Sequence, residues 1–223
     1  MNKIMVGTWA WGTGKNGSKF VFGKKRNPLE LKETFYAAIK CGFQNWDTAA
    51  SYGAGTCEKF LGELMDDKKE LMVSTKYCPG KKFKQGELTK SFEASCIRLK
   101  RKQIDLFWIH IPRNLIENIK EVIPLQKAGR IGKIGIANVS LKQIKEVRGL
   151  LEAEGLSLGA VQNHFSLLRS DQGEIIEYCK AMGIDYYEYM VLEQGALSGH
   201  YSAEHPFPKF HMYRNYLWQR MFH

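Results

Sequence analysis

The stretch that decides the fold runs from Ile104 to Val139 and reads IDLFWIHIPRNLIENIKEVIPLQKAGRIGKIGIANV. Its first part, IDLFWIHIP, is almost continuously apolar, which is typical of a strand buried on both faces. The middle part, LIENIKEVIPLQKAGR, predicts a helix, and IGKIGIANV predicts a second strand. A strand, a helix and a strand in this order predict a parallel pair joined by a helical crossover.

The same alternation of strand-like and helix-like segments continues in both directions from this unit. Short apolar runs predict seven strands, at residues 3–9, 43–49, 70–77, 104–112, 131–139, 158–165 and 184–191. Helical patterns predict six helices, at residues 27–42, 55–67, 88–102, 115–130, 140–155 and 170–183. Asn27 is the expected N-cap of the first helix, with Pro28 in its first turn and Gly42 at its end. The alternation predicts an α/β protein, either a TIM barrel or a doubly wound open sheet.

One glycine-rich stretch bears on this choice. The letters GTGKNG place Gly12, Gly14 and Gly17 in the spacing G-x-G-x-x-G of a dinucleotide fingerprint. That fingerprint must open a helix directly, whereas the following residues, SKFVFGKKRNP, predict no helix before Asn27. We therefore interpret the stretch as a flexible or hairpin loop, and the TIM barrel is favoured.

Size and composition indicate a globular protein. The 223 residues suit one large domain or two small ones, and 44% are hydrophobic and 25% charged. The five cysteines form no C-x-x-C pair, which predicts reduced thiols in the cytoplasm and no metal site. The N-terminal apolar run is too short for a signal peptide, and no later run is long enough to span a membrane.

The formal net charge is +10 at neutral pH. Such a balance fits nucleic acid, an acidic membrane surface, a phosphorylated small molecule or simply a solvated basic surface. The basic residues are dispersed along helical faces rather than gathered in one stripe with aromatics between them, as a nucleic-acid groove requires. We therefore expect neither a nucleic acid nor a membrane as partner.

Polar residues collect where the predicted strands end. They are Asp47, Tyr52 in the loop that follows, Lys76, His110, Asn138, Gln162 and Asn163. In a TIM barrel the carboxyl ends of all strands share one face, and that face holds the active site. Each residue alone has a structural explanation, such as a helix cap or a core histidine. Their joint occurrence predicts a catalytic site.

The chemistry of this set suits reduction of a carbonyl group. A carbonyl that accepts a hydride needs a proton on its oxygen, and a tyrosine hydroxyl, with an ordinary pKa of about 10, holds one at neutral pH. We expect the Lys76 ammonium to lower the pKa of Tyr52. Asp47 would pair with Lys76 and compensate its charge. His110 would orient the substrate carbonyl.

These residues lie in motifs that resemble the aldo/keto reductase family. From about Ile4 to Lys209, the resembling segments are VGTWAWG, NWDTAASYG, STKY, LFWIHIP, GIANVS, VQNHFSLL and YMVLEQGALSG. The resemblance implies a TIM barrel that binds a nicotinamide cofactor, usually NADPH, without a Rossmann domain. It implies NADPH-dependent reduction of an aldehyde or ketone to an alcohol. It also implies a catalytic tetrad of Asp47, Tyr52, Lys76 and His110, with Tyr52 as general acid.

The resemblance assigns further residues to the cofactor. Asn138 and Gln162 would grip the nicotinamide carboxamide, and Tyr189 would stack on the nicotinamide ring. Gly7, Thr8 and Trp9 match the end of the first strand near the cofactor. The residues that match the loop over the pyrophosphate are Leu192, Gln194, Gly195 and Leu197. Two positions depart from the family pattern, since Ala137 and Met190 stand where serine is usual or common.

The larger departure concerns the end of the chain. A TIM barrel needs eight strands and usually about 250 residues, whereas the predicted strands number seven. We expect residues 1–209 to form an incomplete barrel and leave residues 210–223 as an unassigned tail. We expect the family's grip on the adenosine 2′-phosphate to be missing, and therefore weak binding of NADP(H), with NAD(H) as the alternative, and self-association through the open barrel edge. The alternative function is a truncated, catalytically weak or inactive relative that acts as a binding or interaction module.

Overall fold

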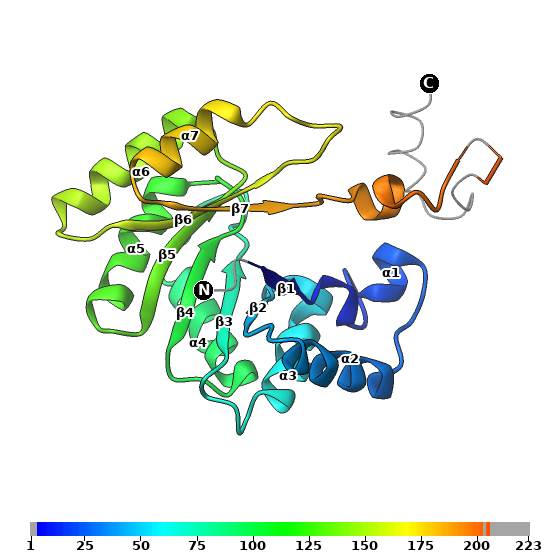
Figure 1. Cartoon of the computed structure of the whole chain (residues 1–223). Helices are drawn as coiled ribbons and strands as arrows, with labels where there is room; N and C mark the ends of the chain where they lie inside the picture. The colour runs from blue at the N-terminus through cyan, green and yellow to red at the C-terminus, as the bar shows by residue number, and fades with distance from the viewer. Residues whose placement is uncertain (1–3, 203, 206–223) are drawn as a thin grey trace.

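The computed structural model describes residues 4–202, 204 and 205, and its chain path is shown in Figure 1. The described strands form one seven-stranded sheet in the order β1-β2-β3-β4-β5-β6-β7, with every neighbouring pair parallel. The strands are β1 (Met5–Gly7), β2 (Asn45–Asp47), β3 (Met72–Tyr77), β4 (Ile104–Ile109), β5 (Ile131–Ala137), β6 (Leu158–His164) and β7 (Asp185–Tyr189). The predicted tail at residues 210–223 lies outside the described residues.

Helices alternate with the strands along the chain. The α-helices are α1 (Ser18–Phe22), α2 (Pro28–Lys40), α3 (Thr56–Leu64), α4 (Glu87–Leu99), α5 (Leu115–Lys127), α6 (Leu141–Ala153) and α7 (Gly173–Ala181). Three short 3-10 segments are η1 (Trp9–Trp11), η2 (Tyr52–Gly55) and η3 (Glu193–Ser198). None of the described helices is long and apolar enough to cross a membrane.

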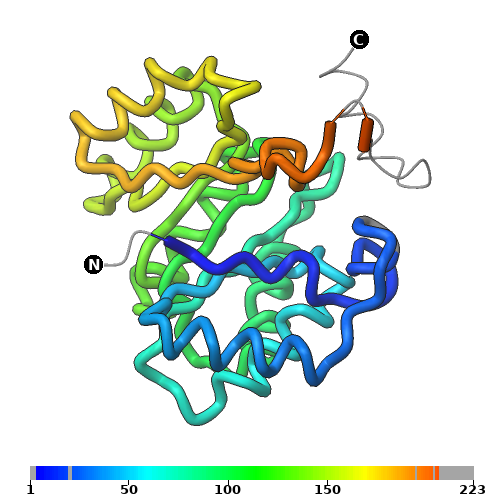
Figure 2. The backbone as a smooth tube through the Cα atoms, turned by 45° about the vertical axis from the view of Figure 1, so that its right-hand side comes forward, coloured from blue at the N-terminus to red at the C-terminus, as the bar shows by residue number. Residues whose placement is uncertain are grey.

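The sheet curls, with helices α2 to α7 along its outer side (Figures 1 and 2). Alternation within β4 shows how both faces are buried. Phe107 and Ile109 belong to the main core, which also holds the helix side chains, whereas Leu106 and Trp108 form a separate cluster. Met5 of β1 and Tyr187 of β7 pack against this second cluster, which places it inside the curl. The fold is therefore a TIM-type barrel with seven strands in its described part, as the sequence predicted.

In the described part of the chain, each of the two outer strands of the sheet has a neighbouring strand on one side alone. Within the described residues, β1 pairs with β2 and β7 pairs with β6, but β1 and β7 do not pair with each other. A cavity of about 460 Å³ lies between them, lined by residues such as Met5, Tyr187 and Val191. We call it the edge cavity. Unpaired strand edges are templates for pairing with another chain.

The glycine-rich loop differs from the sequence prediction in one respect. Helix α1 begins at Ser18, directly after Gly17, so the expectation of no helix before Asn27 is wrong. The glycines have a packing reason: a Cβ at Gly17 would lie 2.7 Å from the carbonyl oxygen of Gly12, which accepts a hydrogen bond from the Ser18 amide. Gly14 has a φ of +73°, which favours glycine. A five-residue helix is too short to show a periodic pattern.

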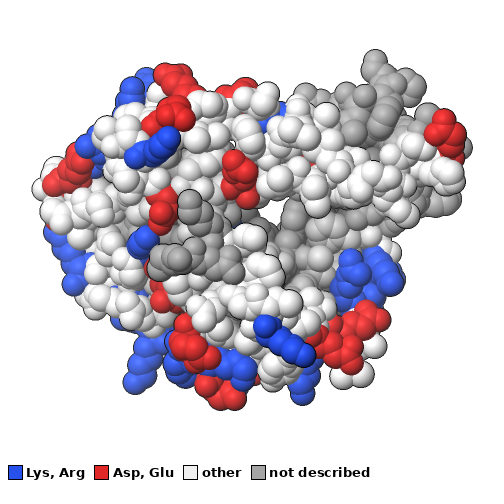
Figure 3. Space-filling model, in the orientation of Figure 1, with Lys and Arg blue, Asp and Glu red and all other residues white. Residues whose placement is uncertain are grey.

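The charged surface is mixed. Basic and acidic side chains are interspersed on the face shown in Figure 3. Exposed ion pairs on the described surface include Lys127 with Glu154 and Lys133 with Asp185, both at 2.7 Å. Pairs of this kind contribute little stability, about 0–1 kcal/mol each.

Candidate active site

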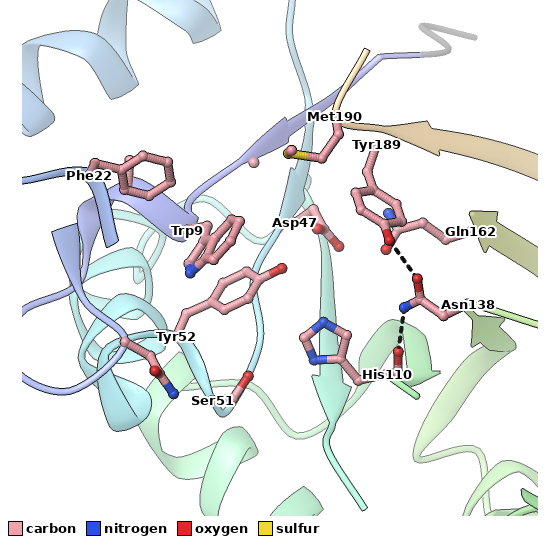
Figure 4. A pocket seen from close by; sticks show the side chains of 13 residues that line it. Trp9, Phe22, Asp47, Ser51, Tyr52, His110, Asn138, Gln162, Tyr189 and Met190 are labelled. Atoms are coloured by element: carbon pink, nitrogen blue, oxygen red, sulfur yellow. Dashed lines mark hydrogen bonds between the residues drawn. The ribbon is translucent and has the colours of Figure 1, made fainter. Parts of the chain in front are cut away.

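A cavity of about 630 Å³ opens at the carboxyl ends of the strands. We call it the site cavity, and Figure 4 shows its lining. The predicted site residues that line it are Gly7, Trp9, Asp47, Tyr52, His110, Asn138, Gln162 and Tyr189. The parallel register brings these strand ends together, since Gly7 lies beside Asp47 and Ala137 beside Gln162. Further lining residues are Met190, noted above as a departure from the family pattern, and four that the sequence did not single out, namely Ala10, Asn16, Phe22 and Ser51.

Asp47 and Lys76 form a buried ion pair beneath this cavity. The Lys76 ammonium donates to the Asp47 carboxylate and, at 2.9 Å, to the carbonyl oxygen of Thr48. The hydroxyl of Ser74 donates to the other carboxylate oxygen of Asp47. Burial lowers the pKa of Lys76, and the Asp47 carboxylate opposes that shift. The predicted pairing of the two residues is confirmed, and β2 and β3 hold it because Asp47 lies beside Ser74 in the sheet.

Tyr52 lies at the start of η2, with its ring over the site cavity. The Lys76 nitrogen lies 5.5 Å from the centre of that ring. Burial raises the pKa of the Tyr52 hydroxyl well above its ordinary value, and the Asp47 carboxylate raises it further. The pKa of Tyr52 is therefore raised, not lowered as predicted, because burial and the Asp47 carboxylate both favour the protonated hydroxyl. Desolvation disfavours the phenolate, and Asp47 compensates the charge of Lys76.

His110 follows β4 and faces Tyr52 across the cavity. Their ring centres lie 5.8 Å apart in an edge-to-face arrangement. Burial, with a contribution from the Lys76 ammonium, lowers the pKa of His110 to about 3. The imidazole is therefore neutral at physiological pH and can donate one hydrogen bond. The backbone of His110 is tied to β3 by a 2.8 Å bond from its amide to the carbonyl oxygen of Tyr77.

Aromatic side chains form one wall of the cavity. The ring of Trp9 stacks on Tyr52 at 5.7 Å and meets Phe22 edge to face at 5.2 Å. The sequence placed Trp9 near the cofactor, and the structure adds that it covers the ring of Tyr52. Phe22 was missed because it lies on the short helix α1. The apolar letters KFVF in that loop were the available signal.

Amide and phenol groups form the opposite wall (Figure 4). The Asn138 side chain donates to the carbonyl oxygen of His110 at 2.8 Å and accepts from the Tyr189 hydroxyl at 2.5 Å. Asn138 adopts a left-handed backbone with φ of 61°, which asparagine tolerates better than most residues. Gln162 places a second amide on this wall from β6. The wall offers amide groups and an aromatic ring to a planar ligand that carries a carboxamide.

The remaining predicted cofactor residues lie outside the lining of the site cavity. Thr8 is fully buried, and its hydroxyl donates to the carbonyl oxygen of Asp47 at 3.0 Å, so it supports the site from below. The loop residues predicted over the pyrophosphate fall in or next to η3, after β7. They are Leu192, Gln194, Gly195 and Leu197.

The sequence reasoning also missed a polar cluster that adjoins Tyr189. The Glu193 carboxylate is buried and accepts a hydrogen bond from the Ser166 hydroxyl, while His164 lies 2.7 Å from the same oxygen. A single acidic residue within the run VLEQGALSG was the available signal. Across residues 4–202, 204 and 205, no group of three or more His, Cys, Asp or Glu side chains is placed to hold a metal ion.

The chain also matches a known protein family. The model of the aldo/keto reductase family matches residues 3–220. The chain belongs to the aldo/keto reductase family. The match extends beyond Lys209, where the resemblance read from the sequence ended.

Among aldo/keto reductases, the chain is 27% identical over 218 residues to the chloroplastic pyridoxal reductase of Arabidopsis thaliana, covering 88% of this chain and 58% of that protein. A solved glycerol dehydrogenase of Gluconobacter oxydans superimposes with a TM-score of 0.75 at 26% identity, covering 93% of this chain and 65% of the other. A mutant of Gox0644 in complex with NADPH superimposes with a TM-score of 0.68 at 22% identity, covering 87% and 65%, a likeness of fold. The chain spans about three-fifths of the length of the curated relatives it matches.

Proposed function

We propose that the chain is an oxidoreductase that uses NADP(H) to reduce the carbonyl group of a small aldehyde or ketone, with Tyr52 as the proton donor. The observation that carries the proposal is the convergence of Tyr52, His110 and the buried Asp47–Lys76 pair at one cavity. Membership of the aldo/keto reductase family supports the reaction class. The NADPH-bound relative of the same fold supports the choice of cofactor.

The wall of the site cavity fits the nicotinamide half of such a cofactor. Asn138 and Gln162 present amide groups that can pair with a carboxamide, and the Tyr189 ring offers a flat surface beside them. The residues that would hold the cofactor are those already predicted, with Gly7 and Trp9 at the first strand end and the η3 segment near the pyrophosphate. When bound, the nicotinamide supplies a hydride to the carbonyl carbon.

The chain's own side chains then handle the carbonyl oxygen. The neutral imidazole of His110 can donate a hydrogen bond to this oxygen and orient the carbonyl in the cavity. Tyr52 keeps its proton at rest because its pKa is raised, and it releases the proton to the alkoxide, which is a stronger base than the phenolate. The Lys76 ammonium lies near enough to stabilise the phenolate as it forms.

The walls of the cavity support a substrate class. Trp9, Phe22 and Met190 give one part of the lining an apolar and aromatic character. This character favours carbonyl compounds with an apolar or aromatic body. We propose the cytoplasm as location because the described cysteines are free thiols.

Titration of the purified chain with NADPH and NADH, followed by cofactor fluorescence, tests the proposal. Oxidation of NADPH should follow when aromatic and aliphatic aldehydes are added. We predict weak binding with little preference between the two cofactors. Tight binding of NADPH with a strong preference over NADH would overturn this prediction. Binding of neither cofactor would overturn the proposed function.

A second candidate is a binding or interaction module without turnover. The open edges of β1 and β7 and the edge cavity between them favour it, because they offer backbone groups to another chain. The same titration separates the two candidates, since a module of this kind would show no cofactor-dependent reduction.

A further inference from the structure

A polar cluster, buried at Ser166 and Glu193, adjoins Tyr189, and the proposed mechanism does not use it. We call it the Glu193 cluster, and it consists of His164, Ser166, Arg169 and Glu193. Glu193 Oε1 lies 2.7 Å from His164 Nε2 and accepts a hydrogen bond from the Ser166 hydroxyl at 2.5 Å. Arg169 lies 3.2 Å from the other ring nitrogen of His164. The cluster joins the end of β6 to the segment that follows β7.

The carboxylate of Glu193 is placed where solvent cannot hydrate it. The residue is 2% exposed, and a carboxylate in such a position is costly unless it accepts hydrogen bonds. His164 and Ser166 supply bonds to Oε1, while Oε2 has no partner among the described residues. The Glu193 side chain is therefore fixed by these two partners and in turn fixes them.

The backbone around Glu193 adopts conformations that need support. Met190 has a φ of 61° and Glu193 a φ of 45°, both in the left-handed region that residues other than glycine rarely adopt. A residue in such a conformation is strained and persists only when its surroundings hold it. Met190 lines the site cavity, and its carbonyl oxygen accepts the Glu193 amide at 2.8 Å. The bonds of the Glu193 side chain thus hold a strained turn at the rim of the cavity.

His164 connects this turn to Tyr189. Arginine has only donors, so Arg169 donates to Nδ1 of His164, which leaves Nε2 to donate to Glu193. The two contacts at opposite nitrogens set the plane of the imidazole. That ring stacks on the ring of Tyr189, with centres 5.3 Å apart and an interplanar angle of 28°. Tyr189 is therefore held at its hydroxyl by Asn138 and at its ring by His164.

We infer that His164 and Glu193 are positioning residues that fix the ring of Tyr189 against the site cavity and so raise the affinity for the nicotinamide cofactor. The inference rests on the proposed function for its cofactor, and on contacts within the chain for the position of Tyr189. Neither His164 nor Glu193 lines the site cavity, so both act through Tyr189 and the turn after β7. Because the ring of Tyr189 is held in place before the cofactor binds, binding loses no conformational entropy by ordering this ring.

Four variants separate this role from a general effect on folding. His164→Ala removes the ring behind Tyr189, and Glu193→Ala removes the acceptor of both His164 and Ser166. Glu193→Gln keeps an acceptor oxygen in nearly the same shape. Glu152→Gln is the control, because Glu152 belongs to an exposed pair with Arg148 on α6. The fraction of folded protein in each sample is checked by thermal unfolding.

The first readout is cofactor affinity by fluorescence titration. We expect His164→Ala and Glu193→Ala to weaken NADPH binding by about 3- to 10-fold, the range that loss of an aromatic pair represents. Glu193→Gln and Glu152→Gln should stay within about twofold of the wild-type protein. Turnover at saturating NADPH should change less than affinity in all four. Unchanged affinity in folded His164→Ala would overturn the inference.

The second readout needs no cofactor. Fluorotyrosine is incorporated throughout, and the ¹⁹F resonance of Tyr189 is assigned by its loss in Tyr189→Phe. Removal of the neighbouring imidazole should shift this resonance in His164→Ala, and Glu152→Gln should leave it in place. If the wild-type protein binds neither NADPH nor NADH, the proposed function fails, and this spectrum still decides whether His164 positions Tyr189. A Tyr189 resonance that is unchanged in His164→Ala would overturn that positioning.

Discussion

The Lys76 ammonium donates a hydrogen bond to the Asp47 carboxylate inside the barrel, where the Lys76 side chain is 1% exposed. A charge at this depth persists because it is paired and because Thr48 and Ser74 add hydrogen bonds around it. The pair places a fixed cation near the ring of Tyr52 without leaving an uncompensated charge in the core.

Replacing Asp47 by asparagine should therefore destabilise the fold strongly. The Lys76 ammonium would remain buried without its countercharge, which typically costs about 3–5 kcal/mol. Asp185→Asn is the matched control, because it removes one partner of the exposed Lys133–Asp185 pair and should cost less than about 1 kcal/mol. Urea unfolding measures both. If the free energy of unfolding fell equally in the two variants, the buried pair would not be more important for stability than the exposed one.

Stability should depend on pH through His110. Its pKa in the folded chain is about 3, below the ordinary value of 6.5, so between these values the unfolded chain binds a proton that the folded chain excludes. The free energy of unfolding should thus fall as pH drops from about 6.5 toward 3, by up to about 1.4 kcal/mol per pH unit from this group.

Urea unfolding at several pH values tests the contribution of His110. His110→Gln should show a shallower pH dependence than the wild-type protein, whereas His205→Gln, at an exposed position, should not. Superimposable pH dependences for the wild-type protein and His110→Gln would show that this imidazole does not resist protonation.

The sequence predicted the fold through its strands. The run Ile104–Ile109 is apolar on both faces of the pleat, and the structure buries both faces, Phe107 toward the helices and Trp108 inside the curl. Helix α1 escaped prediction because five residues show no period and because its start depends on close packing at Gly17.

The candidate site was predictable where it depends on strand order alone. Parallel strands bring their carboxyl ends together, so Asp47, His110 and Gln162 could be placed at one face from their positions in the sequence. The raised pKa of Tyr52 could not be predicted, because it depends on the burial of the hydroxyl and on its distance from the Asp47 carboxylate. Phe22 lies on the short helix α1 and Glu193 on the short 3-10 segment η3, and segments of this length carry no periodic signal.

As far as the structure describes the chain, β1 and β7 are the outer strands of an open sheet, which predicts self-association. Ile4, next to β1, and Val191, shortly after β7, are exposed and line the edge cavity. Lysine at a sheet edge disfavours pairing with another chain, so Ile4→Lys and Val191→Lys should shift the protein toward monomer. Ile97→Lys, at an exposed position on α4, is the control.

Size-exclusion chromatography with light scattering measures this association over a range of concentrations. The wild-type protein and Ile97→Lys should elute as dimers or larger species that dissociate on dilution. A wild-type protein that is monomeric at all concentrations would contradict the prediction.

The most direct test of the central claim is the turnover of Tyr52→Phe. This variant keeps the ring that stacks on Trp9 and removes the proposed proton donor. With an aldehyde that the wild-type protein reduces, the rate should fall by about 10²- to 10⁴-fold. NADPH affinity should stay within about twofold of the wild-type value. Tyr36→Phe, at an exposed ring on α2, should retain full turnover. Full turnover in Tyr52→Phe would contradict the account.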